Sequence, residues 1–91
     1  MIDPRLPGAD LVAAGLRDLT EGRTRTVEAL LVTIGAPRLA ALGLVVPPGV
    51  SEPEEELYAV LAREHGNGAH NQFNALIGRL VSFERASDCV A

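Results

Sequence analysis

Both histidines and all three asparagines of the chain lie between residues 64 and 74. Imidazole and carboxylate groups are usable metal ligands, and a helix start at this corner would favour an anion. His65 and His70 are five residues apart across two glycines, whereas a zinc-binding HExxH helix carries its histidines four apart on one face. The spacing is therefore not a preformed metal motif. The alternative is a turn at Asn67-Gly68 whose polar neighbours solvate the next helix start.

Two glutamates fall on apolar helix faces. At about 100° per residue, Glu84 lies within an arc of large apolar residues, and Glu64 falls between Leu57 and Val60. A carboxylate on such a face must be paired, protonated or at a frayed helix end. If the two helices face each other, a candidate ligand, metal or acid–base site forms from Glu64, His65, His70 and Glu84. The alternative is ion pairing to Arg17, Arg23 or Arg38, or exit to solvent in the last turn.

The sequence contains no other pattern that is typical of a catalytic site. The serines and Cys89 have no activating neighbours in sequence, and the nine glycines do not form a phosphate-binding loop. We therefore assign no catalytic residue, predict no cofactor, and favour a role other than that of an enzyme.

The elements that position these side chains are predicted to be helices. The composition has 13 Leu, 13 Ala and 9 Val against 3 Ile, which favours helices over strands. The clearest buried stripe is Val27, Leu30, Leu31 and Ile34, at the i, i+3, i+4, i+7 spacing. Periodicity and punctuation together predict five helices, at residues 10–20, 24–34, 37–42, 52–65 and 69–87.

Capping signals define most of the expected boundaries. Ser51 and Glu54 match a capping box with Pro53 in the first turn, which predicts that Ser51 is the N-cap of the fourth helix. Asp10 is predicted to cap the first helix, and Thr24 or Thr26 the second.

Ninety-one residues support one core, so the fold class is a small all-α bundle of four to five short helices. Its long C-terminal helix is expected to be central or at a dimer interface. We expect an irregular N-terminal arm at 1–9, a single helical domain at 10–87 and a tail at 88–91.

The charge pattern bears on partners. Eight arginines and no lysine, typical of a GC-rich bacterial genome, stand against twelve acids, which gives a net charge of −4. Nucleic acid is therefore not an expected partner. A DNA-binding regulator acting through residues 27–44 is kept as an alternative, although its short second helix offers only Arg38. No signal peptide, membrane span or disulfide framework is predicted, which favours a cytoplasmic protein.

The main functional hypothesis is a protein–protein interaction module acting as a homodimer or binding another protein. Nearly half of the chain is apolar, and a domain of this size cannot bury all of that surface. The candidate interface is the broad apolar arc of the last helix, formed by Phe73, Leu76, Leu80, Val81 and Phe83. A small enzyme or a metal- or ligand-binding domain using the Glu64–His70 corner with Glu84 is the alternative.

Overall fold

The structure is a computed structural model that describes residues 2–90, and it confirms the all-α fold class. No strand occurs within that range. The elements in chain order are α1 (Ala9–Thr20), α2 (Val27–Ile34), α3 (Ala36–Ala41), α4 (Pro53–His65), a short 3₁₀ turn η1 (Gly66–Gly68) and α5 (Ala69–Val90). Helix α5 continues three residues beyond its predicted end at residue 87. Met1 and Ala91, parts of the expected arm and tail, lie outside the described residues.

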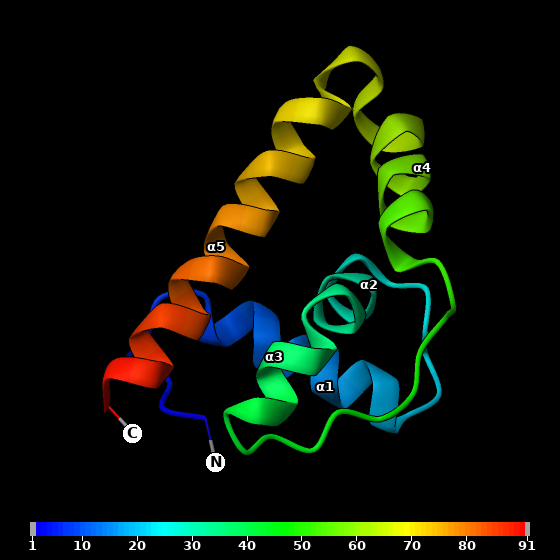
Figure 1. Cartoon of the computed structure of the whole chain (residues 1–91). Helices are drawn as coiled ribbons and strands as arrows, with labels where there is room; N and C mark the ends of the chain where they lie inside the picture. The colour runs from blue at the N-terminus through cyan, green and yellow to red at the C-terminus, as the bar shows by residue number, and fades with distance from the viewer. Residues whose placement is uncertain (1, 91) are drawn as a thin grey trace.

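Helices α4 and α5 form an antiparallel hairpin that opens like an inverted V, with η1 at its apex (Figure 1). Helices α1, α2 and α3 fill the wide end, and the segment between α3 and α4 runs around the outside of that group (Figure 1). Helix α2 contacts α1, α3, α4 and α5. The apex of the hairpin thus projects beyond the part of the molecule that contains most of the core.

The innermost element is α2. Its Ala29, Leu30, Leu31 and Val32 are fully buried, whereas Val27 and Ile34 at its ends are half-buried. A helix that is apolar nearly all round is expected to be surrounded by other elements. The two central residues of the predicted stripe are therefore buried as expected, its two end residues are partly buried, and burial extends to the neighbouring faces of the helix.

The start of α2 is fixed by a polar junction with α1. The Ala29 N–H donates to Thr26 Oγ1 at 3.0 Å, so Thr26 is the N-cap, one of the two predicted candidates. The Thr26 hydroxyl donates to Asp18 Oδ2 at 2.7 Å, and Arg23 Nη2 donates to Asp18 Oδ1 at 2.9 Å. Asp18 is buried, and the hydrogen bonds that its carboxylate accepts from both residues compensate for that burial.

Two predicted caps are wrong. The N-cap of α4 is Glu52 rather than Ser51, and no side chain caps this helix. Pro53 explains the shift, since proline at the first helical position pushes the preceding residue out of the α region, and Glu52 has φ −129° and ψ 67°. The N-cap of α1 is Gly8, with φ 76°, and Asp10 lies in the first turn, where it accepts from Arg79 Nη2 at 3.0 Å.

This difference in capping predicts a difference in stability. Thr26→Ala removes an N-cap and one hydrogen bond to Asp18, so it is expected to lower the free energy of unfolding by about 1–2 kcal/mol. Ser51→Ala removes no bond seen here and is expected to change it by less than about 0.5 kcal/mol. Urea unfolding followed by circular dichroism measures both. A loss for Ser51→Ala equal to that for Thr26→Ala would contradict the assignment of Glu52 as the N-cap.

Candidate functional site

Three of the four candidate site residues lie at the apex of the hairpin. Glu64 and His65 end α4, and His70 lies in the first turn of α5. His65 Nε2 is 3.9 Å from Glu64 Oε1, while His70 Nε2 is 3.2 Å from the side-chain nitrogen of Asn74. All three candidates are exposed. Residues 2–90 contain no group of three His, Cys, Asp or Glu side chains placed to hold a metal ion.

Glu84 lies elsewhere. It follows His70 by fourteen positions on the same helix, which separates the two residues by about 21 Å along the α5 axis. Glu84 is only 7% exposed, so of the alternatives left open by the sequence, exit to solvent in the last turn is not what occurs. The structure therefore does not bring Glu84 to the corner with Glu64, and the four candidates do not form one site.

The surroundings of Glu84 were only partly foreseen. Arg38, one of the three arginines named as its possible partners, is near enough for its charge to lower the pKa of Glu84. Burial acts in the opposite direction with greater effect, so the pKa of Glu84 is raised above its ordinary value. Arg23 is instead committed to Asp18.

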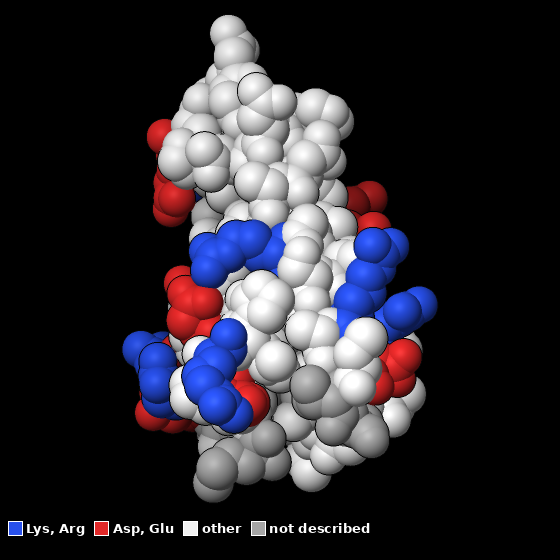
Figure 2. All heavy atoms as spheres, turned by 90° about the vertical axis from the view of Figure 1, so that its left-hand side faces the viewer, with Lys and Arg blue, Asp and Glu red and all other residues white. Residues whose placement is uncertain are grey.

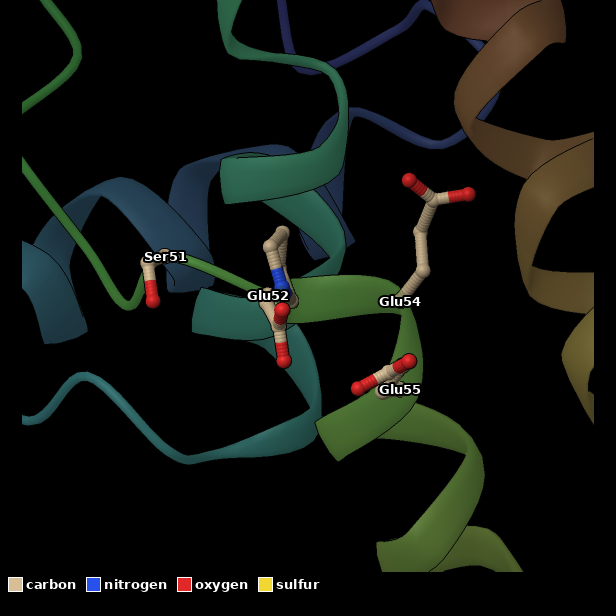
Figure 3. A pocket seen from close by; sticks show the side chains of 5 residues that line it. Ser51, Glu52, Glu54 and Glu55 are labelled. Atoms are coloured by element: carbon tan, nitrogen blue, oxygen red, sulfur yellow. The ribbon is translucent and has the colours of Figure 1, made fainter.

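A second group of carboxylates surrounds the start of α4. A shallow hollow there is lined by Ser51, Glu52, Pro53, Glu54 and Glu55 (Figure 3). The Glu54 carboxylate points away from those of Glu52 and Glu55 (Figure 3). A hydrogen bond with Glu52 and repulsion from its charge raise the pKa of Glu55. These acids lie at the positive end of a helix dipole, which accounts for their position without a ligand.

The candidate interface on α5 divides into two groups. Leu80 and Phe83 are 3% and 1% exposed, so they belong to the core of this chain. Phe73, Leu76 and Val81 are half-buried. Of the five residues of the candidate interface, only these three keep apolar surface that another molecule could cover.

Beyond Glu64, the part of the hairpin that continues from the apex into α5 is free of charge. The thirteen residues Gly66–Gly78 include no Asp, Glu, Lys or Arg. Figure 2 shows the centre of the upper face free of charged side chains, with arginines and acids gathered lower down. Beside this segment Tyr58 is 42% exposed, and its ring lies 5.8 Å from that of Phe73, tilted by 50°. The polar residues of this segment were candidates from the sequence, whereas its lack of charge, which the sequence also shows, was not used.

The segment considered for DNA binding has an unfavourable arrangement for that role. Helix α2 is enclosed by the other helices, and α3 is six residues long with Arg38 as its one charged side chain. A recognition helix normally offers several donors to bases and phosphates.

Comparisons with known proteins add no assignment. In the described part of the chain, no helix combines the length and apolar character needed to cross a membrane. No protein-family model matches the chain, and no curated protein or solved structure is significantly similar to it.

Proposed function

We propose that the chain is a protein–protein interaction module that forms a homodimer through the apex of the α4–α5 hairpin. The observation that carries this proposal is the projecting, charge-free segment Gly66–Gly78 with half-buried apolar residues along it. The centres of protein interfaces are depleted of charged residues and enriched in aromatic ones. Phe73 and the exposed Tyr58 supply the aromatic surface.

A second copy of the chain is the partner that this chemistry fits. In a twofold dimer the same patch meets itself, so any charge near the axis meets a like charge. Amide side chains both donate and accept hydrogen bonds and can pair with their own copies. The exposed residues of the apex include four such amides, Asn67, Asn71, Gln72 and Asn74. We place this module in the cytoplasm, where its single free cysteine, the exposed Cys89, stays reduced.

The test introduces one charge into the apex. Asn74 is exposed, so Asn74→Glu is expected to leave the fold intact and to weaken dimerisation by about tenfold or more, because like charges across a twofold axis repel. Ser82→Glu is the matched control: it places the same charge at an exposed position of the same helix outside the charge-free segment. Light scattering coupled to size exclusion, over a range of protein concentrations, measures both.

The proposal also predicts which result would end it. A wild-type chain that elutes as a monomer at high micromolar concentration contradicts the homodimer. A dimer that Ser82→Glu weakens as much as Asn74→Glu does would show that the apex is not the interface. Leu76→Asp, with circular dichroism to confirm folding, gives a second measurement at a half-buried position of the same surface.

A further inference from the structure

Helix α5 passes close to the junction of α2 and α3, and Glu84 lies at this crossing. A Cβ atom on Gly35 would lie 3.1 Å from Glu84 Oε2 and 3.0 Å from a methyl group of Leu80. The glycine therefore leaves space for the carboxylate to lie against the backbone of the junction.

The Glu84 carboxylate has no partner within the described chain. Glu84 is only 7% exposed. Within residues 2–90, however, no group donates a hydrogen bond to its carboxylate, and no cationic nitrogen lies within 4.0 Å of it. Burying a charge without a partner costs free energy. No fully enclosed side-chain oxygen or nitrogen in these residues lacks a partner, so the Glu84 oxygens must reach the surface of a hollow.

Two adjoining hollows between α3 and α5 share Glu84 and Arg38. The first has largely apolar walls, from Ile34, Ile77 and Val81 among others, and the second extends past Arg85 and Asp88. Each has a volume of ≈ 280 Å³. Small-molecule sites usually span about 300 to 1,000 Å³, so these hollows together suit a ligand at the small end of that range.

We propose that this hollow binds a free aliphatic α-amino acid, with its ammonium group on Glu84, its carboxylate on Arg38 and its side chain against Ile34, Ile77 and Val81. The site offers one acidic and one basic group beside an apolar wall, and a zwitterion with an apolar side chain complements all three. A simple amine or a simple carboxylate would satisfy one group and lie beside a like charge. The charged groups of the site, Glu84 and Arg38, lie outside the segment Gly66–Gly78, and of the apolar wall only Ile77 belongs to that segment. Leucine binding can therefore be measured separately from self-association.

The experiment follows backbone amide signals in ¹H–¹⁵N spectra while L-leucine is added to the intact chain. We expect saturable shifts centred on the α2–α3 junction and on residues 77–84. Isoamylamine, which is leucine without its carboxylate, and 4-methylpentanoate, which is leucine without its ammonium group, are expected to bind roughly tenfold more weakly or worse, because each loses a charged hydrogen bond. Glu84→Gln and Arg38→Gln are expected to weaken leucine binding by a similar factor. Arg63→Gln, an exposed arginine on α4, is the control and should leave it unchanged.

A pH series provides a second readout. The charged groups that line the two hollows with Glu84 are Arg38 on α3 and Arg85 and Asp88 on α5. Helix α2 and the junction after it contribute Ile34 and Gly35, which do not titrate. Since burial raises the pKa of Glu84, protonation on acidification should weaken leucine binding before ordinary carboxyl groups titrate. Glu84→Gln should abolish that dependence. It should also raise the melting temperature at pH values where glutamate is ionised in the unfolded chain, because burial disfavours the charged form of Glu84, and this gain should shrink as the pH falls.

Three results would overturn the proposal. Shifts that do not saturate would show that no site exists, which is also the result expected if Arg38 simply closes onto Glu84. Equal affinity in Glu84→Gln would place leucine elsewhere. Tighter binding of isoamylamine than of leucine would show a cation site without a role for Arg38.

Discussion

Gly15→Ala is expected to lower the free energy of unfolding by about 2 to 3 kcal/mol, the scale of an overpacked core. Helices α1 and α2 cross with the backbone of Glu28 and the side chain of Val32 against this glycine. A Cβ atom there would lie 2.4 Å from both the Glu28 carbonyl oxygen and a Val32 methyl carbon. Because one of these atoms belongs to a helix backbone, relief requires the two helices to separate. Urea unfolding measures the change.

The sign of this effect makes it diagnostic. Inside a helix, replacing glycine with alanine ordinarily stabilises by up to about 1 kcal/mol. Gly78 in α5 is the matched control, because it is exposed and a Cβ atom there would meet nothing within 4 Å. Gly78→Ala should therefore stabilise the chain. If Gly15→Ala also stabilises it, α1 and α2 do not cross at this residue.

The helices were predictable because local signals define them. Periodic apolar residues and punctuation by glycine and proline locate each helix to within about three residues, and the centre of the stripe on α2, at Leu30 and Leu31, is buried as expected. The caps were less predictable because two signals competed at one place. Ser51 with Glu54 matched a capping box, but Pro53 set the geometry of Glu52 and made that residue the cap. The restriction that Pro53 places on the backbone torsion angles of Glu52 outweighed the capping preference of the Ser51 side chain, which can hydrogen-bond to water instead.

The candidate site was less predictable because helical periodicity predicts the face of the helix on which a residue lies, but not which residues of other helices lie opposite that face. The same argument placed Glu64 and Glu84 on apolar faces, yet Glu84 is buried and the Glu64 side chain is 59% exposed. Glu64 is in the last turn of α4, at the end of the hairpin that projects beyond most of the core (Figure 1), and there its side chain reaches solvent. What lies opposite Glu84 depends on α5 crossing the α2–α3 junction. That approach depends on the absence of a side chain at Gly35, which no helical period reveals.

Phe83→Ala is expected to lower the free energy of unfolding by about 3 to 5 kcal/mol, the usual cost of truncating a fully buried aromatic side chain. Phe83 is 1% exposed and is the largest of the fully buried side chains. It also packs close to the N-terminal arm, since a Cβ atom on Gly8 would lie 3.3 Å from the Phe83 Cβ. Domains of this size are stable by only about 5 to 15 kcal/mol, so the variant should be partly unfolded at physiological temperature. Thermal unfolding followed by circular dichroism measures the change.

The dependence on protein concentration separates a core role from an interface role for this residue. If Phe83 packs within its own chain, the loss relative to the wild type is the same at low and at high micromolar protein, because the substitution leaves the association step unchanged. Val81→Ala is the comparison, since Val81 is half-buried on the same helix and loses fewer contacts, so its cost should be smaller. A Phe83→Ala chain that stays as stable as the wild type but becomes monomeric would place the ring between two copies. The burial of Phe83 within a single chain would then be wrong.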